Sequence, residues 1–168
     1  KSLAAIKGLF PTEQEEYFVA GLLHDLGKLP LNKQFPEEYF KVCQSASNQS
    51  ESFYHSEDRR LGIDHCKVGA MIAEKWRLGE SLVETLSNHH HPDDCTEDSQ
   101  EMVSTVALAN QIAIELQIGA AGDGFTDRAM LEELTDKVGA NYGQLSDFHE
   151  SVSREVEKAS IFLEIAQK

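Results

Sequence analysis

Cysteine is scarce in this sequence and is not arranged in pairs. The 168 residues include three cysteines, Cys43, Cys66 and Cys95, which is an odd number with no CxxC spacing. A reduced setting inside the cell is the simpler interpretation, and no spacing supports a disulfide.

Long apolar runs are also absent. No run approaches the roughly 20 residues that a membrane-spanning helix needs, and residues 1–6 do not resemble a signal peptide. We therefore predict a cytoplasmic protein without a membrane partner. The chain does not begin with methionine, which suggests a fragment or a processed chain. Its length and its 40% hydrophobic content are ordinary for one globular domain.

Basic residues are few. The chain has 15 lysines and arginines against 29 aspartates and glutamates, which gives a formal net charge of −14. Such a surface repels phosphate backbones, so general nucleic-acid binding is not expected. An anionic substrate would need a local cation, and a bound metal ion could supply it.

The alternation of apolar and polar residues that marks β-strands is missing, and the helical period is present instead. We predict an all-α fold with a core over residues 1–118 and a C-terminal helical extension, residues 119–168, packed on that core. Residues 44–56 read as a loop or weak helix, and the glycine-rich residues 119–125 as a connector. Helices are expected over residues 12–27, from 36 to about 43, and over 65–77, 80–90, 99–118, 127–138 and about 144–166.

The first of these helices carries the most informative pair of residues, His24 and Asp25. Thr12 and Glu15 form a capping-box pattern at its start, and Gly27 fits its end. This placement puts the pair in the last turn, on or beside the core-facing stripe. Soluble proteins rarely bury His and Asp side by side unless something binds them.

Other polar residues fall at helix ends or within apolar stripes. His65 is at the first turn of its helix, where it would by itself be read as a capping or surface residue. The spacing of helix 80–90 continues onto His89 and His90, whereas His91 is expected to be exposed. Asn110 interrupts the apolar face of helix 99–118, and a core Asn bonded to backbone is its simplest interpretation.

A helical bundle can bring such residues together in its core, as helical di-metal proteins do. Imidazole and carboxylate ligands together favour Fe, Mn, Zn, Ni or Co over Ca or Mg. Asp25 could bridge two cations and so hold an activated hydroxide, and Lys28 could meet a substrate phosphate. The alternative is a set of buried histidines bonded to one another and to backbone carbonyls.

The ordered combination of motifs resembles the HD phosphohydrolase superfamily, and specifically its HDOD (HD-related output domain) branch. The resemblance covers roughly residues 15–115. It rests on His24-Asp25 within residues 21–28, on residues 57–70 with His65 inside them, on Trp76, and on His89-His90 before Pro92.

The resemblance implies an HD-like helical bundle and a role for each matching residue. His24, Asp25, His65, His89 and His90 match metal ligands of the superfamily. Lys28 matches a lysine that contacts phosphate, and Asn110 stands where the last ligand, an Asp, is expected. No GYP sequence follows the histidine pair, unlike in the HD-GYP relatives that cleave cyclic di-GMP. The family's upstream helices, with the first ligand, would precede residue 1.

Two functions follow from the resemblance. HDOD relatives are commonly found in bacterial signal transduction without an established catalytic activity, which implies an output module that contacts a signalling protein partner. The second function is a metal-dependent phosphohydrolase that acts on a phosphorylated small molecule, a nucleotide or a cyclic dinucleotide, with Asp25 and Lys28 as catalytic residues. Asn110 and the missing GYP favour the module, because losing a carboxylate ligand weakens a metal site.

Overall fold

The computed structural model describes residues 1–47, 52–117 and 126–139, and every regular element in these ranges is helical. The predicted all-α class is therefore confirmed. The elements in chain order are α1 (Ser2–Ile6), α2 (Pro11–Leu23), α3 (Lys28–Gln34), α4 (Pro36–Ser47), α5 (Phe53–Leu61), α6 (His65–Lys75), α7 (Glu80–Asn88), the short 3-10 helix η1 (Pro92–Asp94), α8 (Gln100–Glu115) and α9 (Arg128–Val138). No helix in the described ranges is long and apolar enough to cross a membrane.

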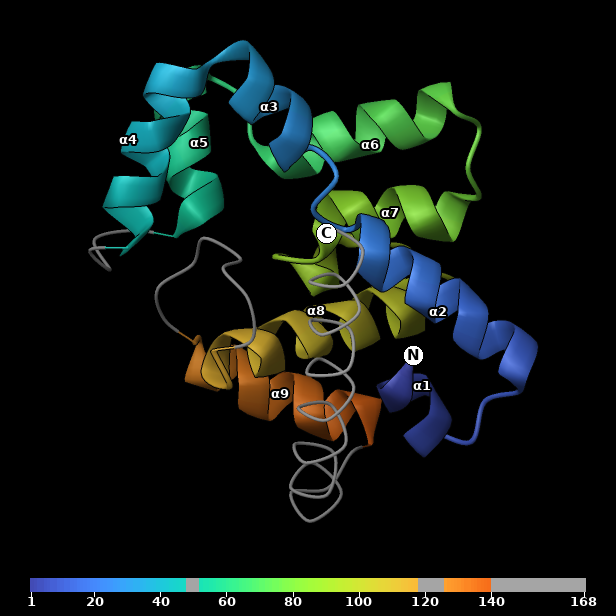
Figure 1. The fold of residues 1–168 in the computed structure, drawn as a ribbon. Helices are drawn as coiled ribbons and strands as arrows, with labels where there is room; N and C mark the ends of the chain where they lie inside the picture. Colours follow the sequence, from blue (N-terminus) through green and yellow to red (C-terminus); the bar gives the residue numbers. More distant parts are fainter. Residues whose placement is uncertain (48–51, 118–125, 140–168) are drawn as a thin grey trace, which may run out of the picture.

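The first predicted helix, residues 12–27, is divided in two. Helix α2 ends at Leu23, and Gly27 is the N-cap of α3 rather than the end of α2. Pro30 lies in the first turn of α3, where a backbone N–H needs no helical partner. Between the two helices the chain turns (Figure 1). The Lys28 N–H donates to Asp25 O at 3.0 Å in this turn. This corner, residues 24–27, carries the His-Asp pair.

The corner lies directly against the first turns of α6. A Cβ atom added at Gly27 would overlap the carbonyl oxygen of His65 and come within 2.8 Å of the Gly69 nitrogen. Gly69 is itself in contact with Leu86 of α7, since its own added Cβ would lie 3.3 Å from that side chain. Glycines at positions 27 and 69 therefore allow the α2–α3 corner, α6 and α7 to approach closely.

The described parts of residues 44–56, which are residues 44–47 and 52–56, are more helical than the sequence suggested. Helix α4 continues to Ser47, and α5 runs from Phe53 to Leu61. Its C-cap is Gly62, whose positive φ of 74° suits glycine. The two helices pack against each other (Figure 1). The sequence did not predict α5 because the helix is mostly polar and buries only a few residues, among them Phe53 and Glu57.

Two large aromatic side chains, Trp76 and Phe18, are exposed. Trp76 is 59% exposed because α6 ends before it, at Lys75, and the residue is only its C-cap. Phe18 is 47% exposed on the outer face of α2. On α9, Leu134 and Val138 are buried.

The second half of the described chain is built on α8. One apolar cluster joins Leu3 of α1 to Leu108 of α8 and to Leu134 of α9. Asp127 caps α9 by accepting the Met130 N–H at 3.0 Å. The predicted connector 119–125 and the helix expected at about 144–166 lie outside the described residues.

We predict that Gly27→Ala destabilises the protein by roughly 1–3 kcal/mol, the usual cost of forcing a methyl group into a packed site. The new methyl group must push the corner away from α6, which thermal unfolding would detect. Gly21→Ala is the matched control, since nothing lies within 4 Å of its added Cβ and alanine favours a helix interior. Equal melting temperatures for the two variants would contradict the close contact.

Candidate metal centre

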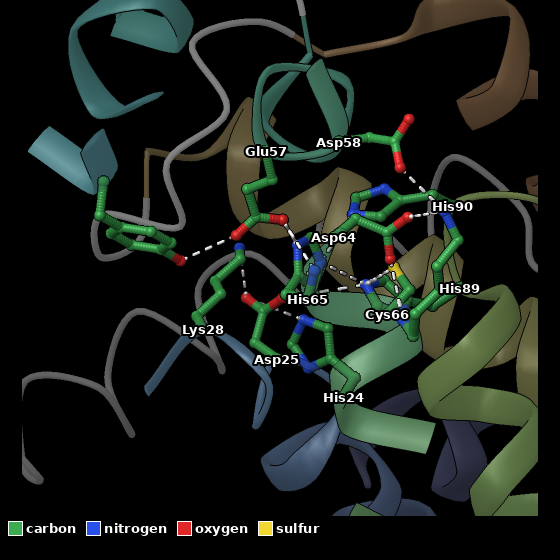
Figure 2. Close-up of polar contacts among 12 residues, drawn as sticks. His24, Asp25, Lys28, Glu57, Asp58, Asp64, His65, Cys66, His89 and His90 are labelled. Atoms are coloured by element: carbon green, nitrogen blue, oxygen red, sulfur yellow. Dashed lines mark hydrogen bonds and ion pairs between the residues drawn. The ribbon is translucent and has the colours of Figure 1, made fainter. Parts of the chain in front are cut away.

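Three segments bring their polar side chains to one place (Figure 2). The α2–α3 corner supplies His24 and Asp25, the first turn of α6 supplies His65, and the end of α7 supplies His89 and His90. His65 and His89 are fully buried, with exposures of 0% and 1%. His65 is thus a core residue rather than a surface cap, and His91 is exposed as predicted.

His65, His89 and His90 all direct their Nε2 atoms toward one another. His65 Nε2 lies 3.3 Å from His89 Nε2 and 3.2 Å from His90 Nε2. Both members of the His89-His90 pair therefore point inward, at consecutive positions where the helix has just ended.

The Nδ1 atoms of His24 and His89 lie within hydrogen-bond distance of backbone carbonyl oxygens. His24 Nδ1 is 2.8 Å from Gly21 O, and His89 Nδ1 is 3.2 Å from both Thr85 O and Leu86 O. Carbonyl oxygens only accept, so these Nδ1 atoms carry the protons and the Nε2 atoms present lone pairs to the centre. Burial, followed by the charges of neighbouring histidines, holds the pKa values of His89 and His90 well below their ordinary value. Neutral imidazole is the form that binds metals.

Asp25 lies between the histidines and Lys28. Its Oδ1 is 3.3 Å from His65 Nε2 and 3.8 Å from His89 Nε2. Its Oδ2 accepts from Lys28 Nζ at 2.8 Å. Burial by itself would raise the pKa of the Asp25 carboxyl, but the charges of His24 and Lys28 and of the other histidines outweigh it and lower the pKa to about 2. Asp25 is a carboxylate at neutral pH.

Glu57 of α5 also contacts the candidate site, although its sequence pattern gave no reason to assign it there. It is completely buried, and its carboxylate accepts from the His65 ring Nδ1 at 2.5 Å and from the His65 backbone N–H at 2.8 Å. Its other oxygen accepts from the Tyr39 hydroxyl at 2.9 Å. A carboxylate behind a metal-binding histidine fixes its tautomer and makes it a stronger ligand.

A cavity of about 500 Å³ lies beside the centre, on the far side of His90. The ring of Tyr54 stacks on His90 with centroids 4.7 Å apart, and both residues line the cavity. Four of its lining residues are acidic: Asp93, Asp94, Asp127 and Glu133.

Two buried atoms without hydrogen-bond partners indicate whether a cation fits between the histidines and Asp25. Among the described residues, His24 Nε2 and Asp25 Oδ1 are buried without a hydrogen-bond partner, because the 3.3 Å approach of Asp25 to His65 lacks hydrogen-bond geometry. Unpaired buried lone pairs are costly, and a cation would satisfy both. Two imidazole nitrogens bound to one tetrahedral Zn²⁺ at 2.0–2.1 Å would be about 3.4 Å apart, close to the 3.2–3.3 Å observed. The residues fit a metal ion.

Two predicted site residues keep their roles as predictions. Asn110 is buried on α8, with 8% exposure, and its ligand role is not tested by the geometry described above. Lys28 lies beside Asp25, and its Nζ is 4.8 Å from the Phe53 ring centroid. Its contact with a substrate phosphate remains a prediction.

The chain matches a known protein family. The profile of the HDOD domain matches residues 3–92, which is more than half of the chain. The chain therefore belongs to the HDOD family. An uncharacterized protein of Treponema pallidum (strain Nichols) is 28% identical over 93 residues, which is 55% of this chain and 18% of that protein.

Two solved structures share the fold, and they confirm the predicted HD-like helical bundle. An HDOD domain protein of unknown function from Geobacter sulfurreducens gives a TM-score of 0.66 at 24% identity, over 85% of this chain and 52% of that one. A candidate phosphohydrolase from Shewanella amazonensis SB2B gives 0.65 at 24% identity, over 89% and 54%. The chain thus spans about half the length of these solved relatives.

We predict that Glu57→Gln weakens metal affinity by about 10–100-fold, the usual effect of removing such a supporting carboxylate. The amide cannot supply the charge that holds the His65 Nδ1–H. Calorimetric titration of the full chain with Zn²⁺ or Co²⁺ measures the change. Asp58→Asn is the matched control, because Asp58 is the next residue on α5 and pairs with the exposed Lys67 instead. A Glu57→Gln affinity equal to that of the control would show that Glu57 does not support the site.

Proposed function

We propose that this chain is a metal-binding HDOD output module of bacterial signal transduction, which acts in the cytoplasm through contact with a protein partner. The observation that carries the metal proposal is the pair of unpartnered buried atoms, His24 Nε2 and Asp25 Oδ1, among the converging histidine nitrogens. Membership of the HDOD family, which is associated with bacterial signalling, supports the proposed role as an output module.

His24, Asp25, His65, His89 and His90 would hold the metal. Their mixture of neutral imidazoles and one carboxylate suits Fe, Mn, Zn, Ni or Co. A bound ion would supply positive charge that ties the α2–α3 corner to α6 and α7. Because binding favours only the folded arrangement, the ion would stabilise the domain.

The surroundings of the centre favour a module over an enzyme for phosphate esters. The cavity beside His90 is lined by four carboxylates, and the chain has a formal net charge of −14. Both features repel an anionic substrate and attract a basic partner. Asn110 in place of a carboxylate adds to this argument, since it offers a weaker ligand.

The second candidate is a metal-dependent phosphohydrolase, and Lys28 is the observation that favours it. Its Nζ lies 2.8 Å from Asp25 Oδ2, so a cationic group stands next to the centre where a phosphate oxygen would need one. The Shewanella relative described as a candidate phosphohydrolase has the same fold. In this function Asp25 would hold the metal and Lys28 would orient the phosphate.

We predict that the purified chain contains a transition metal in near-stoichiometric amount. Elemental analysis measures it directly, and His89→Ala should lose most of the metal because His89 belongs to both groups of potential ligands. Asp94→Asn, an exposed carboxylate on η1, should retain it. A chain that stays metal-free after loading with Fe, Mn, Zn, Ni and Co in turn would instead support a hydrogen-bonded network of buried histidines.

An assay for phosphodiester cleavage distinguishes the output module from the phosphohydrolase. We expect Mn- or Fe-loaded protein to leave bis(p-nitrophenyl) phosphate and cyclic di-GMP intact over long incubations, because the site repels anions. Product release can be followed by absorbance and by chromatography. Metal-dependent cleavage that Asp25→Ala abolishes would overturn the module and establish the hydrolase.

A further inference from the structure

The Cys66 side chain lies at the centre although the function above does not use it. The residue directly follows His65 on α6 and is 6% exposed. Its Sγ is 3.9 Å from His89 Nε2, and one ligand atom from each of His65, Cys66, His89 and His90 lies within 4.8 Å of the others (Figure 2).

The other two cysteines have different environments. Cys95 Sγ donates to Pro92 O at 3.1 Å, away from the histidine nitrogens. Cys43 packs against the apolar cluster around Tyr39 and Val42. Of the three thiols, Cys66 is the buried one, and it faces imidazole nitrogens.

We propose that Cys66 is a sulfur ligand of the metal centre, completing with His65, His89 and His90 a set of three nitrogens and one sulfur. Such a set selects a borderline-soft divalent cation, Zn²⁺ or Co²⁺, over Mn²⁺ or Mg²⁺. This inference rests on the proposed metal binding and names the class of cation that the site takes.

The distances between the donor atoms support this set. A sulfur at about 2.3 Å and a nitrogen at 2.0–2.1 Å from one tetrahedral Zn²⁺ are about 3.6 Å apart. The 3.9 Å between Cys66 Sγ and His89 Nε2 exceeds this by a few tenths of an ångström, within reach of a small side-chain rotation. The thiolate would also bring a negative charge to three neutral imidazoles.

Cys66 changes what the centre can do. His89 belongs both to this set and to the set formed with His24 and Asp25, and its single Nε2 can serve only one ion. Four protein ligands close a tetrahedral zinc site, whereas catalytic sites keep a position open for water. An ion held by Cys66 is therefore structural, which agrees with an output module.

Cobalt titration of the full chain tests the role of Cys66. We expect Co²⁺ to produce a thiolate-to-cobalt charge-transfer band in the near ultraviolet together with the visible bands of a tetrahedral ion. Cys66→Ser should remove the near-ultraviolet band, weaken Co²⁺ and Zn²⁺ affinity by at least about tenfold, and leave Mn²⁺ affinity nearly unchanged. Cys43→Ser and Cys95→Ser are the matched controls and should keep the wild-type spectrum.

The outcomes distinguish this inference from the function on which it rests. Cobalt bound by the wild-type chain without a thiolate band, or with a band that survives in Cys66→Ser, would overturn the role of Cys66 and leave the metal site in place. No cobalt binding by the wild-type chain would overturn both. Cys66→Ala and a far-ultraviolet circular dichroism spectrum of each variant establish that lost binding is not lost folding.

Discussion

The contact between the α2–α3 corner and α6 sets the position of the candidate ligands. Gly27 lies so close to His65 O and to the Gly69 nitrogen that a single added methyl group cannot be accommodated. This contact places His24 and Asp25, which follow the end of α2, directly against the first turn of α6. Without it, the Asp25 carboxylate would not reach the His65 ring at 3.3 Å.

Burying polar groups around this contact costs free energy unless each group has a hydrogen-bond partner. Which groups have partners therefore indicates what the cluster is for. Glu57 is completely buried, yet its carboxylate has three hydrogen bonds, from the Tyr39 hydroxyl and from the His65 ring and backbone. A network that only completed the core would satisfy its inner atoms equally well. Here the Nδ1 atoms of His24, His65 and His89 are paired, whereas His24 Nε2 and Asp25 Oδ1 are not. Both of these unsatisfied atoms belong to the His-Asp pair of the α2–α3 corner.

The sequence predicted the helical class and most of the candidate ligands because both depend on local patterns. The helical period indicated α6 to α8, and His24, Asp25 and the His89-His90 pair stand beside apolar stripes. It missed the break before α3, because Gly27 is compatible both with ending a helix and with preceding one. It missed Glu57, because a buried glutamate on a polar helix has no local signal. Its burial comes from contact with Tyr39 on α4 and His65 on α6, which are different helices from its own.

The choice between module and enzyme depends on how the donors are shared. Asp25 and Lys28 together could hold a metal and a phosphate, but their salt bridge at 2.8 Å already neutralises the lysine charge that a phosphate would need. Cys66 on the other side of His89 offers a fourth ligand to the histidine set. An ion drawn to the sulfur leaves Asp25 with Lys28 and closes the coordination sphere to water. The same histidines that suggest hydrolysis can therefore serve to hold three helices together.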